Sequence, residues 1–145
     1  DDAPERAKSA DKSDDARTSK ESAEKKKKEK KDNEKKRDEC IDNVKAIKTA
    51  QLAYDASFDK FIETASFHPD SSPGEKKREF TTGSAFDTMG WAPDGEVRGS
   101  YKVVSTSSTD FLVTCITDVD GDGKKATFTT TKTNNVKMNT KDDVY

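Results

Sequence analysis

The chain has no long apolar run, and it is poor in the residues that most often carry chemistry. Its 145 residues include one histidine, one tryptophan and two cysteines, and 29% of residues are hydrophobic against 39% charged. No stretch is apolar enough over a sufficient length to span a bilayer, and no apolar signal peptide stands at the start. We expect the chain to be soluble as given, or to have lost a targeting segment.

Large apolar residues are missing from one part of the chain altogether. The only hydrophobic residues before position 40 are five alanines, and the net charge of the whole chain is −2. Such a segment cannot bury a core, whereas residues 40–145 hold enough apolar side chains for one small core. We predict a highly charged, solvent-exposed extension over residues 1–39, either helical or frayed, and a globular domain over residues 40–145.

Proline and glycine are absent between residues 5 and 65, so nothing forbids a continuous helix there. From position 40 an apolar stripe recurs every three or four residues, as one side of a helix requires. We predict a helix over residues 40–65 whose stripe packs on a sheet. The stripe consists of Cys40, Val44, Ile47, Gln51, Tyr54, Phe58, Phe61 and Ala65.

Residues 66–95 contain three prolines and four glycines, which predicts an irregular region, and their aromatic residues predict that it is packed. Three runs of alternating apolar residues follow within residues 96–131, separated by short turns, and they predict an antiparallel meander. A C-terminal segment, residues 132–145, completes the domain. The fold class is therefore α+β, with a long N-terminal helix packed on a small antiparallel sheet. The side chains expected on the inner face are Val97, Tyr101, Val103, Phe111, Val113, Cys115, Ala126, Phe128 and Thr130.

The two cysteines lie on surfaces that the fold brings together. Cys40 belongs to the helix stripe, and Cys115 shares its strand face with Phe111 and Val113. We expect a Cys40–Cys115 disulfide that ties the helix to the sheet. An isolated disulfide in a small domain favours an oxidising compartment.

The motif DVDGDG places Asp118, Asp120 and Asp122 at positions 1, 3 and 5 of a calcium loop, with Gly123 at position 6. The twelfth position is Thr129 instead of a bidentate glutamate, and the flanking segments are predicted strands. Asp-Gly pairs are equally typical of a hairpin turn. The sequence leaves two alternatives open: the turn binds calcium, or it is a hairpin turn without a cofactor.

Candidate contact residues lie elsewhere on the chain. Lys25, Lys28 and Lys31 could follow a polyanion such as DNA, yet acidic residues are interleaved and no aromatic side chain is available for base stacking. A solvated helix surface is the alternative.

Trp91, in MGWAPDG, is either a partner contact or a plug over the sheet.

The sequence offers little basis for catalysis, because the single His68 stands beside Pro69 and a cysteine in a disulfide is no nucleophile. We expect no enzyme.

The order of several motifs resembles a known family. NVKAIKTAQLAYDASFDKFI is similar to the helix segment of bacterial type IV pilins and pseudopilins, which usually reads NL-x-x-I-x-TAE-x-AY. The segments MGWAPDGEVRGSYKV, DFLVT, DVDGDGKKATFTT and DDVY are similar to pilins that carry a Gly-Trp-x-Pro-x-Gly element and an Asp-Gly-Asp-Gly turn. The resemblance covers roughly residues 36–145.

This resemblance implies a structural subunit of an extracellular or cell-surface filament that acts in adhesion, motility or secretion, and that passes through the periplasm before assembly. Its partners would be other pilin subunits or a separate hydrophobic pilin helix, with host-surface or DNA contact as further candidates. The apolar assembly helix of pilins has no counterpart in residues 1–39. Three explanations stay open: a solubilised pilin, a natural split pilin, or an anchor that lies upstream. The alternative function is a secreted module that binds a cation or a polyanion.

Overall fold

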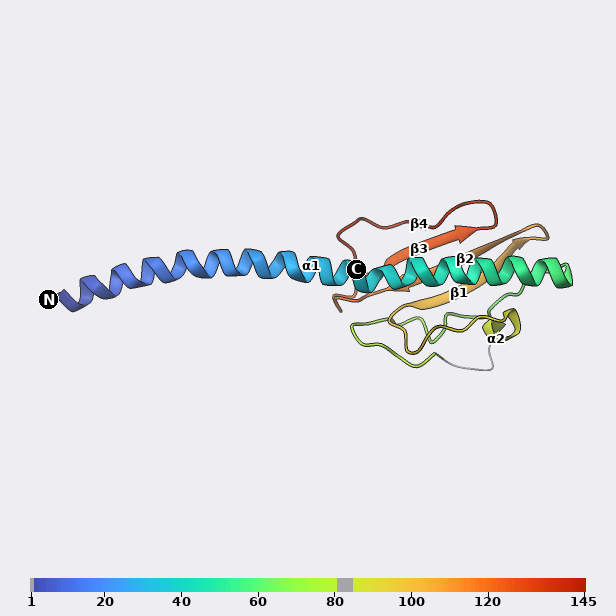
Figure 1. The fold of residues 1–145 in the computed structure, drawn as a ribbon, viewed down its shortest axis with the longest axis horizontal. Helices are drawn as coiled ribbons and strands as arrows, with labels where there is room; N and C mark the ends of the chain where they lie inside the picture. Colours follow the sequence, from blue (N-terminus) through green and yellow to red (C-terminus); the bar gives the residue numbers. More distant parts are fainter. Residues whose placement is uncertain (1, 81–84) are drawn as a thin grey trace. The chain divides into compact units, whose positions relative to one another are not determined.

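The computed structural model describes residues 2–80 and 85–145, with side chains described from residue 23 onward. Two compact units divide the chain, Asp1–Asn33 and Glu34–Tyr145. The second unit combines helix with a four-stranded antiparallel sheet (Figure 1). This is the predicted α+β class. Arg37 and Glu39, which the sequence placed in the extension, make hydrogen bonds within the second unit.

Helix α1 (Asp2–Phe58) contributes residues to both units. In the first unit, the described side chains from residue 23 onward are exposed up to residue 32. The Lys, Glu and Ala residues of this stretch are good helix formers, so the segment can be helical without burying an apolar surface.

The second unit buries only part of the predicted stripe. Cys40, Val44, Ile47 and Gln51 are fully buried, whereas Phe58 is 61% exposed. The predicted end at residue 65 is wrong, because α1 ends at Phe58. Asp59 follows with a positive φ of 55°, a conformation that aspartate tolerates better than most residues and that turns the chain away from the helix.

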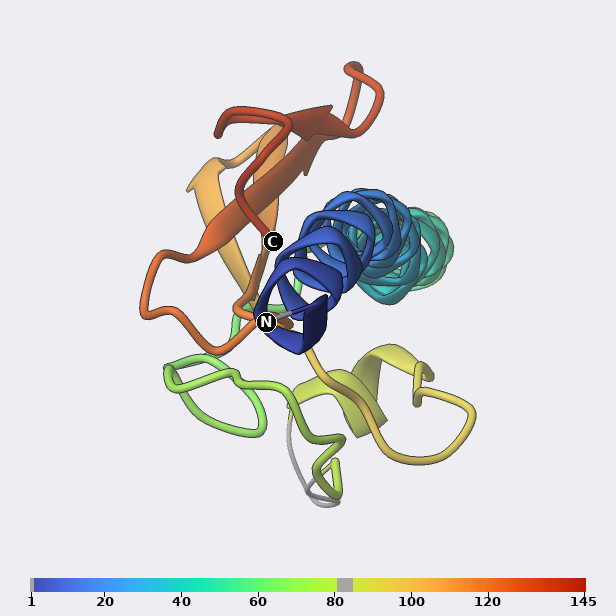
Figure 2. The same cartoon turned by 90° about the vertical axis from the view of Figure 1, so that its left-hand side faces the viewer.

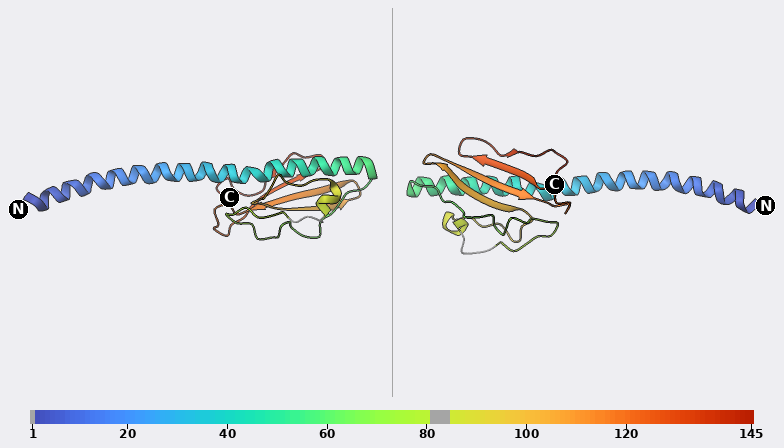
Figure 3. Two further views of the ribbon diagram at one scale, coloured as in Figure 1. Left: turned by 60° about the horizontal axis from the view of Figure 1, so that its bottom comes forward. Right: turned by 180° about the vertical axis from the view of Figure 1, so that it is seen from behind.

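Strands β1 (Ser100–Ser107), β2 (Asp110–Thr117), β3 (Ala126–Thr131) and β4 (Lys137–Met138) form an antiparallel sheet in the order β1-β2-β3-β4. The first three strands confirm the predicted meander. Val97, predicted on the first strand, is buried but lies before β1 and pairs with Arg78 instead. The two-residue β4 was not predicted, since so short a strand carries no alternation. Within the second unit, α1 lies along one face of the sheet (Figures 2 and 3).

The chain after α1 covers the free edge of β1. The N–H of Thr64 donates to the carbonyl of Val103 at 2.8 Å, and His68 exchanges two backbone hydrogen bonds with Tyr101. An uncovered strand edge would offer unpaired backbone groups to other chains. The irregular region therefore covers the β1 edge of the sheet, and β4 forms the opposite edge.

The disulfide Cys40–Cys115 joins α1 to β2, with 5.7 Å between the two Cα atoms. Both cysteines are fully buried. Gly99 packs against them, since a Cβ at this position would lie 2.8 Å from Cys115 Sγ and 3.3 Å from Cys40 Sγ. The helix thus reaches the sheet at a point where only a residue without a side chain fits.

Candidate metal centre and interaction surfaces

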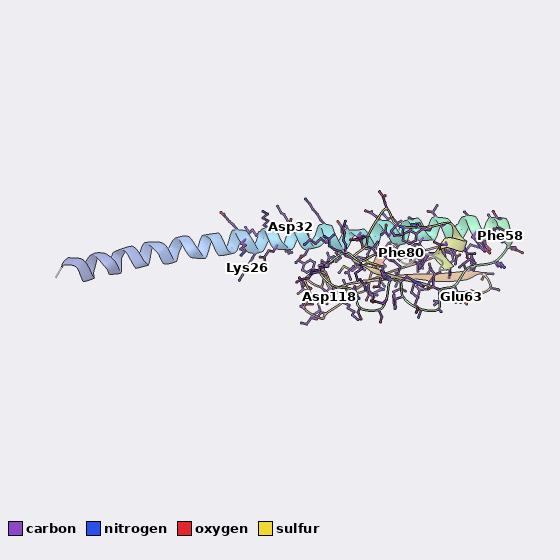
Figure 4. All side chains as sticks on the ribbon, turned by 90° about the horizontal axis from the view of Figure 1, so that it is seen from below. Lys26, Asp32, Phe58, Glu63, Phe80 and Asp118 are labelled. Atoms are coloured by element: carbon purple, nitrogen blue, oxygen red, sulfur yellow. A yellow bond between two sulfur atoms is a disulfide. The ribbon has the colours of Figure 1, made fainter. Side chains whose placement is uncertain are left out.

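The turn between β2 and β3 brings three carboxylates together. One oxygen from each of Asp118, Asp120 and Asp122 lies within 4.8 Å of the others. Two glycines shape the turn: Gly121 and Gly123 have φ values of 68° and 84°, in the left-handed region that favours glycine. The predicted grouping of the three aspartates is therefore present in the fold. Figure 4 labels Asp118 at the end of the second unit opposite Phe58.

Backbone N–H groups occupy one oxygen of each aspartate. Gly123 N donates to Asp118 Oδ2 at 3.0 Å, and Lys124 N donates to Asp122 Oδ1 at 2.8 Å. The contact between Asp122 N and Asp120 Oδ1 is longer, at 3.5 Å. The turn therefore holds the carboxylates in place through its own backbone.

The three carboxylates differ in their electrostatic surroundings. Burial, followed by the contact with Asp118, raises the pKa of Asp120. The hydrogen bond from the Lys124 backbone is the main reason why the pKa of Asp122 is lowered. Acidic groups this close together oppose each other's ionisation, and a bound cation would relieve that repulsion.

The last residues of the chain lie against this turn, which the sequence did not predict. The backbone oxygen of Tyr145 accepts two hydrogen bonds, each 3.1 Å long, from Val119 N and from Thr117 Oγ1. Val119 stands between two members of the aspartate triad. Residues 142–145, which we call the tail, are thus hydrogen-bonded to the turn.

Arg37 of α1 holds the same tail from the other side. Its Nη1 donates to the carbonyls of Asp142 and Val144, both at 2.7 Å, and its guanidinium lies 4.8 Å from the centre of the Tyr145 ring. Arg37 is only 8% exposed. Sequence reasoning assigned Arg37 to the extension, although it precedes Cys40 by one helical turn and so continues the buried stripe.

Trp91 is a core residue instead of a surface contact. It is 8% exposed, and its ring lies 5.4 to 5.8 Å from the rings of three buried aromatic neighbours, Phe80, Phe86 and Tyr101. The short helix α2 (Ala85–Met89) supplies Phe86 to this cluster. The tryptophan therefore offers little surface to a partner, and the plug over the sheet describes it better.

Lys25, Lys28 and Lys31 lie on exposed positions of the first unit. Exposed acidic residues, among them Glu24 and Glu29, alternate with them on the same segment. The described side chains therefore form no purely basic face for phosphates to follow.

A basic groove of about 660 Å³ opens between α1 and the β3–β4 edge. Three of its described lining residues, Arg37, Lys45 and Lys48, are basic and none is acidic. Apolar side chains complete its lining, namely Ile41, Phe128, Val136 and Met138.

An acidic groove of about 370 Å³ lies in the irregular region. Its described lining includes Glu79, Asp87 and Glu96 but no basic residue, and Phe80 and Pro93 form part of its wall. Figure 2 shows β3 and β4 above α1 and the loop around α2 below it. The two grooves thus belong to different sides of the second unit.

The described residues bring no nucleophile and base together around the histidine. The ring of His68 packs against Phe86 at 5.6 Å and Phe80 at 6.3 Å. Its backbone pairs with Tyr101, and Cys40 is committed to the disulfide. His68 therefore has a packing role.

Within the described part of the chain, no helix is both long and apolar enough to cross a membrane. No protein-family model, curated protein or solved structure matches the chain.

Proposed function

We propose that this protein is a structural subunit of an extracellular, type IV pilus-like filament, and that it acts by assembly instead of chemistry. The observation that carries the proposal is the packing of one long helix, through Cys40, Val44 and Ile47, on the inner face of an antiparallel meander. The Cys40–Cys115 disulfide ties the two together. The order of helix, irregular region and meander agrees with the pilin-like motifs of the sequence.

The two grooves support the proposal because their charges are complementary. The basic groove offers Lys45 and Lys48 around apolar side chains, and the acidic groove offers Glu79 and Glu96 around Phe80. Complementary charges align two surfaces and exclude wrong pairings. A contact between one copy's basic groove and the next copy's acidic groove is heterologous, and heterologous contacts that do not close into a ring generate open filaments.

Electron microscopy of the purified protein, alone and mixed with a short apolar helical peptide, tests assembly. We expect filaments only in the mixture, because burying the charged segment of α1 in a helical bundle would strand many charges at several kcal/mol each. A charged peptide of equal length is the control. Filaments from the chain alone would refute this account of the charged segment, and the absence of filaments from every mixture would refute the proposed function.

Charge reversal tests the contact between the grooves. Lys45→Glu with Lys48→Glu should abolish filaments, and Glu79→Lys with Glu96→Lys should do the same. A chain with all four changes should assemble again, because its grooves are once more opposite in charge. The matched control is Lys60→Glu with Lys76→Glu, two exposed positions outside both grooves. Loss of assembly in the control, or failure of the fourfold variant to recover, would contradict the contact.

A further inference from the structure

The aspartate turn contains a buried carboxylate oxygen that has no hydrogen-bond partner among the described residues. Asp118 is 7% exposed, and its Oδ2 accepts the hydrogen bond from Gly123 N. Its Oδ1 is buried and accepts no hydrogen bond from the part of the chain that the structure describes. Leaving such an oxygen unpaired is costly, and buried carboxylates are normally paired with donors or coordinate metals. A positive group at this oxygen would therefore offset the cost of burying it.

Further carboxylates lie close to Asp118. One oxygen of Asp120 and one of Asp122 lie within 4.8 Å of an oxygen of Asp118. A fourth carboxylate, from Glu75, lies against the turn, since a Cβ at Gly121 would meet Glu75 Oε1 at 2.7 Å. Carboxylate oxygens suit Ca²⁺, which accepts a variable coordination geometry, whereas Mg²⁺ demands a near-ideal octahedron and gives up its water reluctantly.

We propose that Asp118, Asp120 and Asp122 bind one calcium ion and that the bound ion holds the tail, residues 142–145, against α1. The link is short. Val119 lies between two of the proposed ligands in the sequence, and its N–H donates to the backbone oxygen of Tyr145. Arg37 anchors the same tail to α1 through two carbonyl groups. Fixing the turn fixes the donor on which the tail depends.

Three carboxylates without a bidentate glutamate make a weak site. Thr129 occupies the position where the strongest calcium loops carry that glutamate. We expect a dissociation constant of roughly 10⁻⁴ to 10⁻³ M, which is typical of extracellular calcium modules. Such an affinity would leave the site filled outside a cell and empty wherever free calcium is scarce.

Thermal unfolding of the full chain in EDTA and in excess calcium tests the site. At ten times the dissociation constant, calcium should raise the melting temperature by roughly 5 °C, and magnesium at the same concentration should raise it much less. Asp118→Asn should abolish the shift, and in EDTA it should melt no lower than the wild type, because it removes an unpaired buried charge. The matched control is Asp94→Asn, in an exposed position away from the turn, which should keep the shift.

The site is overturned if the wild type gains nothing from calcium, if Asp118→Asn keeps the gain, or if Asp94→Asn loses it. Calorimetric titration provides an independent readout, with heat expected for the wild type and none for Asp118→Asn. These measurements require no filament, so their failure is distinguishable from failure of the proposed assembly.

Two measurements test the link to the tail. Hydrogen exchange of the Val119 and Val144 amides should slow in calcium, whereas exchange in α2 should stay unchanged. Coupling is reciprocal, so Arg37→Gln, which releases the tail, should weaken calcium binding about fivefold. Lys35→Gln, at an exposed position of the same helix outside both grooves, is the matched control. Unchanged exchange at Val144, or undiminished affinity in Arg37→Gln, would overturn the coupling.

Discussion

At the scale of single residues, one carboxylate fastens α1 to the start of β1. Glu39 Oε2 accepts hydrogen bonds from Gly99 N at 2.8 Å and from the Tyr101 hydroxyl at 3.0 Å. Asn43 Nδ2 in turn donates to the Tyr101 hydroxyl at 2.9 Å. The Tyr101 hydroxyl can donate to Glu39 only while it carries its proton.

This network predicts a loss of stability at high pH. Burial, followed by the charge of Glu39, raises the pKa of Tyr101 above its ordinary value of 10.0. The folded chain thus binds the phenol proton more tightly than the unfolded chain does. The stability that this gives is fully present below pH 10 and falls above it by about 1.4 kcal/mol per pH unit.

Urea unfolding between pH 8 and pH 11.5 measures this effect. Tyr101→Phe should be less stable than the wild type at pH 8, and its stability should fall less steeply above pH 10. Tyr54→Phe is the control and should follow the wild type. Equal slopes for Tyr101→Phe and the wild type would contradict the prediction.

At the scale of elements, a buried glutamine decides where the chain goes after α1. Gln51 is fully buried. Its Nε2 donates to the Ile62 carbonyl at 2.7 Å, and its Oε1 accepts from Ile62 N at 3.0 Å. The amide replaces a strand neighbour for Ile62 and starts the segment that covers β1. Gln51, the one polar residue of the apolar stripe, thus connects α1 to the segment that follows it.

Replacing Gln51 by leucine keeps the apolar stripe but leaves both backbone groups of Ile62 unpaired. We expect a loss of about 2–4 kcal/mol in the free energy of unfolding. Hydrogen exchange at the Ile62 amide should accelerate as well. Thr49→Ala, on the exposed side of the same helix, should change stability by less than about 0.5 kcal/mol. A stability equal to the wild type in Gln51→Leu would show that the connection is unimportant.

At the scale of the whole molecule, the second unit depends on the contact between helix and sheet. The core residues of α1, β1, β2 and β3 form one apolar cluster around the disulfide. The Cys40–Cys115 disulfide closes a loop with a sequence separation of 75. In the chain-entropy model, the bond limits the unfolded chain more than it changes the folded one.

Removing both cysteines should therefore cost about 4 kcal/mol of unfolding free energy. Urea unfolding of Cys40→Ala/Cys115→Ala, beside the wild type with and without reductant, measures this loss. Reductant should lower the wild-type midpoint and leave the double variant unchanged. A wild-type midpoint that ignores reductant would refute the prediction.

Much of this fold could be predicted because its signals are local. The spacing of Cys40, Val44 and Ile47 marked the buried side of the helix, and alternation around Phe111 and Val113 marked the inner side of the sheet. The aspartate turn was equally visible. The end of α1 was misjudged because Phe61 continues the stripe by spacing alone, although the left-handed Asp59 has already turned the chain.

The sequence by itself determined the buried part of the helix stripe from Cys40 to Gln51, the three long strands and the disulfide, because apolar side chains that recur at a fixed period mark a buried face through local information alone. Only the tertiary structure decided that Trp91 is buried, that Gln51 binds the backbone of Ile62 and Arg37 that of the tail, and that one oxygen of Asp118 has no donor among the described residues. The polar side chains that make these contacts do not recur at a fixed spacing in the sequence. Their partners are the backbone groups that the packed core brings within hydrogen-bonding distance.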